Sequence, residues 1–233
     1  MQSEHCKVSL LHACKEKKMD VIVLIDSFKG SMTSMEAGNA ARDGVLRVYP
    51  HANVTVRPLA DGGEGTTDAL IEGLGGRKVE LSVTGPMGKW VEAYYGILAD
   101  EKTAVMEMAQ AAGIMLVEKA QRNPGKATTY GVGEMIRDAV SRGCRKFIIG
   151  IGGSATNDGG IGMLRALGVK FLTKDGEEAG EGADALGKIH FVSLEHLMPE
   201  LKECDFQIAC DVTNPLCGKD GATYTFGRQK GAT

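Results

Sequence analysis

The chain has 233 residues, a net charge of −3, 43% hydrophobic residues and 24% charged residues. This balance predicts a globular protein of one large or two small domains, and it excludes a disordered or fibrous chain. No apolar run approaches the roughly 20 residues that a membrane-spanning helix needs. We therefore expect no membrane span. Because basic and acidic residues are interspersed, we also expect no nucleic-acid surface.

The first 18 residues are not typical of a signal peptide, because their apolar stretch is short and their positive charges follow it. We interpret residues 1–18 as a disordered or non-native extension and place the start of the first strand at Met19. The six cysteines contain no CxxC pair, which indicates reduced thiols and a cytoplasmic protein.

The chain then opens with a strand–helix–strand–helix pattern. Val21–Ile25 is a continuous apolar run, which predicts a buried parallel strand. Thr33 and Glu36 have the spacing of a capping box and predict a helix that runs to about residue 48. Alternating residues over Asn53–Leu59 predict the next strand, and Thr67–Leu74 is predicted as a short helix. The fold class is therefore predicted to be α/β.

After Gly75 the pattern changes to extended segments that predict an antiparallel meander, at Lys78–Thr84, Trp90–Leu98 and Thr103–Met108. Helices are then predicted over Thr129–Arg142 and Ile161–Leu167, and strands over Lys146–Ile151, Val169–Leu172 and Asp205–Cys210. Residues 174–188 are polar and glycine-rich and are predicted to form an exposed excursion. The change of pattern predicts a domain boundary, with residues 19–67 in one domain and residues 68–233 in a second α/β domain.

The strongest local signal is the stretch from Gly150 to Gly160, which has five glycines in eleven residues and lies between a predicted strand and a predicted helix. Exposed backbone N–H groups at a helix start attract anions, and glycine lets a phosphate approach the backbone. We predict that this stretch binds phosphate or carboxylate, and the candidate contacts are Gly152, Gly153, Ser154, Asn157 and Gly159.

The same stretch matches the dinucleotide fingerprint from Gly150 to Ala155, with Asp175 where a ribose-binding acid would lie. Hydride transfer with NAD is therefore an alternative, but a distant one. Three further glycines would fall in the early turns of the helix, each costing about 1 kcal/mol relative to alanine. Asp158 would also face a pyrophosphate. Its charge is better suited to Mg²⁺ or to a substrate hydroxyl, which favours phosphoryl transfer.

Three more polar loops follow predicted strands. Asp26-Ser-Phe-Lys-Gly-Ser31 offers Lys29 as the counter-charge of a small anion. In the loop after Ala60, Asp61 and Glu64 suit Mg²⁺ or the hydroxyls of a polyol. Asp211 follows the last predicted strand. The alternatives for these loops are a helix cap with a solvated lysine and an acidic turn without a ligand.

The four carboxylates Asp26, Asp61, Asp158 and Asp211 thus each follow a predicted strand. Such positions converge at one edge of a parallel sheet. Because converging carboxylates repel one another unless a cation joins them, they predict a site for a magnesium-bound nucleotide and a small acidic substrate.

Together these motifs resemble the bacterial glycerate kinase type 1 family. The matching stretches are DSFKGS (26–31), ADGGEGT (60–66), VTGPMG (83–88), the RNP and TTYG blocks (122–131), IGIGGSATNDGG (149–160), ACDVTNPLCG (209–218) and FGRQKGAT (226–233). The resemblance covers residues 19–233. It implies a flavodoxin-like three-layer α/β domain with a second mixed α/β domain inserted. It also implies phosphorylation of D-glycerate by ATP with Mg²⁺, giving mostly 2-phosphoglycerate.

The resemblance also implies an interdomain cleft formed by Asp26, Ser27, Lys29, Asp61, Glu64, Ser154, Asn157, Asp158 and Asp211. Within it we expect Lys29 and the 152–159 loop to hold phosphates, and Asp61 and Glu64 to lie near the metal. Asp158 or Asp211 is expected to be the base that accepts the proton of the glycerate hydroxyl.

Members of this family are longer than the chain. Strands that complete the flavodoxin-like domain, and a further Gly-Glu-Gly motif, are expected beyond Thr233. The alternative to a kinase is accordingly a catalytically incomplete fragment that binds nucleotide or a small acid without turnover.

Overall fold

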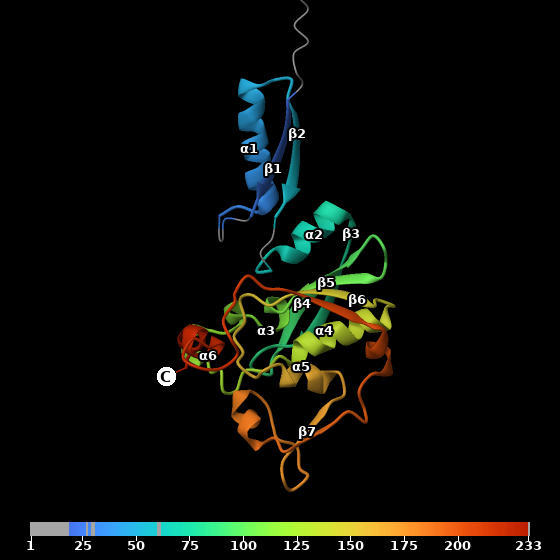
Figure 1. Ribbon diagram of the computed structural model, residues 1–233, viewed down its shortest axis with the longest axis vertical. Helices are drawn as coiled ribbons and strands as arrows, with labels where there is room; N and C mark the ends of the chain where they lie inside the picture. Colours follow the sequence, from blue (N-terminus) through green and yellow to red (C-terminus); the bar gives the residue numbers. More distant parts are fainter. Residues whose placement is uncertain (1–18, 27, 29–30, 60–61, 233) are drawn as a thin grey trace, which may run out of the picture.

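The computed structural model describes residues 19–26, 28, 31–59 and 62–232 (Figure 1). Residues 1–18 and the predicted site residues Ser27, Lys29 and Asp61 lie outside the described residues. The main elements, in chain order, are β1 (Asp20–Ile25), α1 (Ser34–Val48), β2 (Asn53–Pro58), α2 (Thr66–Leu74), β3 (Gly76–Thr84), β4 (Trp90–Leu98), β5 (Thr103–Glu107), α3 (Ala109–Ala112), α4 (Tyr130–Ser141), β6 (Lys146–Gly150), α5 (Ile161–Ala166), β7 (Lys170–Leu172), β8 (Phe191–Ser193), β9 (Asp205–Ala209) and α6 (Ala222–Phe226). The α/β class is confirmed.

The first unit consists of the parallel strands β1 and β2 with α1 against them (Figure 1). The predicted capping box is confirmed, because Thr33 Oγ1 accepts from Glu36 N and Glu36 Oε2 accepts from Thr33 N. Ser34 Oγ donates to Ile25 O and accepts from Leu59 N, which ties the start of α1 to the ends of both strands.

The expectation that β1 is buried holds for one face only. Val23 is 9% exposed, whereas Ile22 and Leu24 are 69% and 56% exposed. The continuous apolar run predicts cover on two faces, and the described elements place α1 on one of them.

The larger sheet has the strand order β3-β4-β5-β6-β9. The predicted antiparallel meander is confirmed for β3, β4 and β5, and β5, β6 and β9 run parallel. Successive residues of a strand point to opposite faces. Tyr95 packs on the α4 side, and a Cβ at the next residue, Gly96, would lie 2.7 Å from Ile71 of α2. Helices α4 and α2 therefore cover opposite faces of the sheet.

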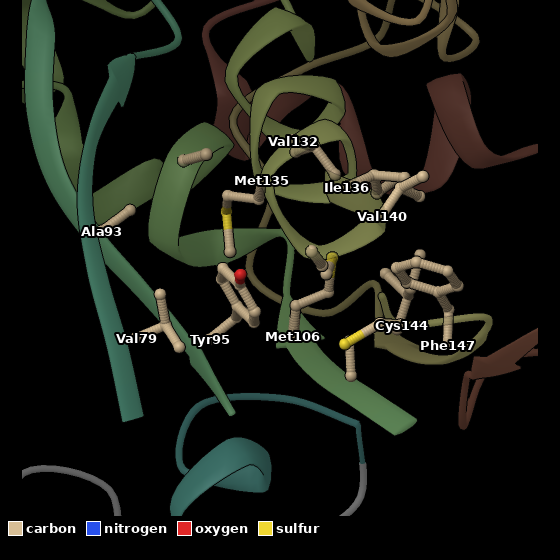
Figure 2. Close-up of a cluster of buried hydrophobic side chains, with 14 of the residues drawn as sticks. Val79, Ala93, Tyr95, Met106, Val132, Met135, Ile136, Val140, Cys144 and Phe147 are labelled. Carbon is tan, nitrogen blue, oxygen red and sulfur yellow. The ribbon is translucent and has the colours of Figure 1, made fainter. Parts of the chain in front are cut away.

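The main core lies between this sheet and α4. Figure 2 shows Tyr95 and Met106 from the strands facing Met135 and Ile136 from α4. Tyr95 is fully buried, and its hydroxyl donates to Asp138 Oδ2 at 2.6 Å. Because Asp138 lies on α4, this hydrogen bond satisfies the buried hydroxyl and attaches the helix to the sheet.

Residues 174–188 are less exposed than predicted. They include a 3-10 helix (Ala183–Lys188), and Ala179 and Ala185 are 5% and 1% exposed. The two alanines join Val169 and Phe171 in a second, smaller core cluster. The prediction of an exposed excursion was therefore wrong at Ala179 and Ala185, because these small apolar residues among polar ones pack into that cluster.

Within the described ranges, no helix is long and apolar enough to cross a membrane. Helix α2 contacts β2 as well as β3, β4 and β5, and the domain boundary near residue 67 stays a prediction.

Candidate functional site

The loop after β2 meets the carboxyl ends of β6 and β9. Gly152 N donates to Gly62 O, and Ile151 N donates to Ala209 O, both at 3.3 Å. Gly62 has a φ of +87°, and a Cβ there would lie 2.6 Å from Ala209 O. The close backbone approach therefore requires glycine at this position. Although β2 belongs to a different sheet from β6 and β9, the three loops meet.

Two hollows flank this meeting point. The smaller one, of about 420 Å³, lies between the start of α1 and α2 and is lined by Asp26, Glu64 and Tyr94 among others. The larger one, of about 670 Å³, is lined by Glu64, Gly152, Gly153, Ser154, Asp211 and Lys230 among others. Both volumes are typical of small-molecule sites. Glu64 and Gln110 line both hollows, so these two side chains form a shared wall.

Glu107, at the end of β5, holds the loop that carries Glu64. Its carboxylate accepts from Gly65 N at 3.2 Å and from Thr67 N at 2.8 Å, and the residue is 1% exposed. Burial raises the pKa of this carboxyl, and the two backbone donors act in the opposite direction. Glu107 was missed from the sequence, although a carboxylate at the end of an apolar strand was the signal used for Asp26.

Asp158 is buried away from both hollows. Its Oδ2 accepts from Thr129 N, Thr129 Oγ1 and Gly162 N at 2.9, 2.8 and 3.2 Å, and its Oδ1 accepts from Gly160 N at 3.1 Å. It is 1% exposed. This carboxylate therefore joins the starts of α4 and α5, and it occupies the backbone amides of Gly160 and Gly162 there. Its role as base or metal ligand stays a prediction that this geometry does not favour.

The other predicted anion contacts divide into two groups. Gly152, Gly153 and Ser154 line the larger hollow. Asn157 instead exchanges hydrogen bonds with Thr223 of α6, at 3.1 and 3.2 Å. Gly159 has a φ of +61° in the turn before α5 and is absent from the lining of either hollow.

Lys230, which the motif analysis did not single out, enters the larger hollow from the C-terminal segment. Its Nζ donates to Ser154 Oγ and to Thr156 O, both at 2.7 Å. Burial lowers the pKa of the ammonium, and Asp158 acts in the opposite direction. The only sequence signal was its place in the FGRQKGAT stretch.

The smaller hollow is strongly acidic. Asp26, Glu36, Glu64, Asp68 and Glu72 all line it. Burial and then the charge of Asp68 raise the pKa of Tyr94, which also lines it.

The described residues contain no group of three or more His, Cys, Asp and Glu side chains placed to hold a metal ion. Asp61, one of the two predicted metal ligands, lies outside them, and Glu64 lies in the shared wall. Mg²⁺ usually takes one or two carboxylates and completes its shell with substrate phosphates. Glu64, which lines the larger hollow, fits an ion that arrives on a nucleotide.

The dinucleotide alternative does not fit the geometry. Strand β6 ends at Gly150, and α5 begins only at Ile161, whereas the fingerprint requires the helix to follow almost at once. Asp175 lies exposed in the turn beyond β7, and β7 belongs to a different sheet from β6.

Fold and site thus define a mixed α/β protein with paired small-molecule hollows at the carboxyl ends of parallel strands. Residues 21–233 match the glycerate kinase family, and the chain belongs to that family. It is 46% identical over 91% of its length to a glycerate kinase from Halalkalibacterium halodurans, and 45% identical over 92% to glycerate 2-kinase from Escherichia coli.

A crystal structure of a protein provisionally named glycerate kinase 2, from Salmonella typhimurium LT2, superposes with a TM-score of 0.86. It shares 45% identity and covers 93% of the chain. The chain spans 56% of the length of the two curated relatives and 58% of that crystal structure's chain.

Proposed function

We propose that the chain takes part in the ATP-dependent phosphorylation of D-glycerate to 2-phosphoglycerate. The observation that carries this proposal is the shared wall: two hollows of small-molecule size meet at Glu64. A kinase needs two ligands in adjacent positions, because the phosphoryl group passes directly between them. Family membership and the name of the Escherichia coli relative support the choice of substrate and of the 2-hydroxyl.

We assign the nucleotide to the larger hollow. Its lining combines Gly152, Gly153, Ser154 and Lys230 with apolar side chains, which include Ile114, Leu116, Val212 and Phe226. This division suits a ligand with a flat apolar base at one end and phosphates at the other. Glycerate, whose hydroxyls donate hydrogen bonds, then binds on the acidic side of the wall, towards Asp26.

Asp211 is the base in this proposal. In this arrangement the reacting hydroxyl reaches past the shared wall to the γ-phosphate in the larger hollow, which Asp211 lines. Asp211 follows β9 directly and is exposed, whereas Asp158 is buried. The hydroxyl oxygen of glycerate forms a bond to the γ-phosphorus, and its proton passes to the Asp211 carboxylate. The bond from the γ-phosphorus to the bridging oxygen breaks, and its electron pair leaves with ADP. Magnesium bound to the nucleotide, held by Glu64, would supply positive charge for the phosphate oxygens.

The test is ADP release by the chain with ATP, Mg²⁺ and D-glycerate, followed by detection of 2-phosphoglycerate with enolase. We expect D211N to lower kcat by about 10²- to 10⁴-fold, the usual contribution of a general base. D205N is the matched control, since Asp205 lies exposed at the opposite end of β9.

Equal kcat values for D211N and the wild-type chain would contradict the role of Asp211. Binding of both ligands without any ADP release would instead favour the fragment alternative.

A further inference from the structure

Lys230 is a half-buried ammonium that has no carboxylate hydrogen-bond or ion-pair partner among the described residues. Both of its hydrogen-bond partners, Ser154 Oγ and Thr156 O, are neutral oxygens. The ion pairs found among the described residues do not include Lys230. The nearby carboxylate of Asp158 already accepts four hydrogen bonds from other groups. A half-buried charge in such surroundings is costly unless an anion joins it.

Hydrogen-bond donors that have no acceptor among the described residues line the same hollow as this ammonium. A lysine ammonium carries three N–H donors, and two of them are used. In the described part of the chain, no acceptor is found for the amides of Gly153 and Ser154. The Ser154 hydroxyl accepts from Lys230 and keeps its own hydrogen to donate. All three residues line the larger hollow.

Arg122 fixes the position of Lys230 relative to the apolar wall of the hollow. Its guanidinium donates to Gln229 O at 3.2 Å, next to Lys230, and to Ile114 O and Val117 O at 3.4 and 3.3 Å. One side chain therefore links the segment that carries the ammonium to the segment that carries Ile114. Ligand groups that contact both ends are held at a set spacing.

We propose that Lys230, with the amides of Gly153 and Ser154, binds a terminal phosphate of the ligand in the larger hollow. The ligand class is a nucleoside polyphosphate, because the anion-binding end lies in the same hollow as an apolar wall. This proposal rests on the proposed function for the identity of the nucleotide, but the phosphate site stands on its own contacts.

The test measures how tripolyphosphate raises the melting temperature (Tm) of the chain, which reports binding to the folded state. We expect protection of the wild-type chain, and at least a tenfold higher tripolyphosphate concentration for the same shift in K230M. K202M is the matched control, since Lys202 is exposed in a different part of the chain, and it should behave as wild type. K230R keeps the charge and should recover part of the affinity.

The Tm without ligand separates anion binding from a structural tether. Because the Lys230 ammonium is half-buried with only neutral hydrogen-bond partners among the described residues, K230M should melt at the same or a higher temperature than the wild-type chain. A K230M chain that melts much lower or fails to fold overturns the proposal, as does equal protection of K230M and wild type or no protection of wild type. Protection by D-glycerate and not by tripolyphosphate, lost in K230M, overturns the assignment to phosphate.

A parallel measurement of ADP release keeps this proposal distinct from the proposed function. Protection by tripolyphosphate that depends on Lys230, in a chain that does not phosphorylate glycerate, supports the phosphate site and contradicts the kinase activity. Turnover that is equal in K230M and wild type overturns the phosphate site and leaves the kinase activity standing.

Discussion

Asp158→Asn separates a structural carboxylate from a catalytic one. The substitution keeps the size of the side chain but removes its charge and turns one acceptor oxygen into an N–H donor. If the amide oxygen stays at the Oδ2 position, the three donors there keep a partner, and Gly160 N, which Oδ1 accepts, is left facing an N–H group.

The expected loss of stability follows from these contacts. An unsatisfied buried donor costs about 1–3 kcal/mol, and a hydrogen bond that changes from a charged to a neutral acceptor loses about 1 kcal/mol. With three such bonds at Oδ2, we expect the free energy of unfolding to fall by about 4–6 kcal/mol. With a urea slope of about 2 kcal/mol/M, the midpoint moves down by about 2–3 M.

The assay is urea unfolding followed by circular dichroism, with D175N as the control. Asp175 is exposed beyond β7, so D175N should stay within about 0.5 kcal/mol of the wild type. An unchanged urea midpoint in D158N, combined with loss of ADP release, would refute this reasoning and restore Asp158 as the base or metal ligand.

Three further predictions concern the loop at Gly62, the core at Tyr95 and the half-buried ammonium of Lys230. G62A should unfold at lower urea than G65A, because both positions have positive φ but only Gly62 lacks room for a Cβ; equal midpoints would contradict the close packing against β9. Y95F should lower the free energy of unfolding by about 1–2 kcal/mol, since it removes the buried bond to Asp138, and a denaturant titration measures this. Burial lowers the pKa of Lys230 in the folded chain, so as pH rises from neutral towards about 10.5 the unfolded state binds more protons than the folded state, and the wild-type chain becomes more stable relative to K230M. The same difference in urea midpoint between the two chains at neutral and at alkaline pH would contradict this.

Local sequence signals were sufficient to predict the helix after Thr33 and the strands of the meander. The capping box at Thr33 and Glu36 was predictable because the two residues are three positions apart, and the meander followed from alternation within each strand. The exposed Ile22 and Leu24 could not be predicted, because an apolar run does not reveal whether one or both faces are covered.

The loops that line the site could be predicted from the sequence, but the hydrogen-bond partners of its residues could not. Glu64, Asp211 and the 152–154 stretch were found because glycines and carboxylates follow strands. The environment of Asp158 depends on Thr129, which directly precedes α4 and is far away in the sequence. Lys230 meets Ser154 only through the fold, so its burial and its neutral partners have no local sequence signal.

The shared wall has a thermodynamic consequence. Whatever cation-bearing ligand neutralises Glu64 from the larger hollow also reduces the repulsion that an acid meets in the smaller hollow, because the same carboxylate faces both. Linkage requires the effect to be reciprocal, so the acid strengthens binding of that ligand by the same factor. A single side chain between the hollows is thereby enough to make occupation of the two sites cooperative, without any change in the fold.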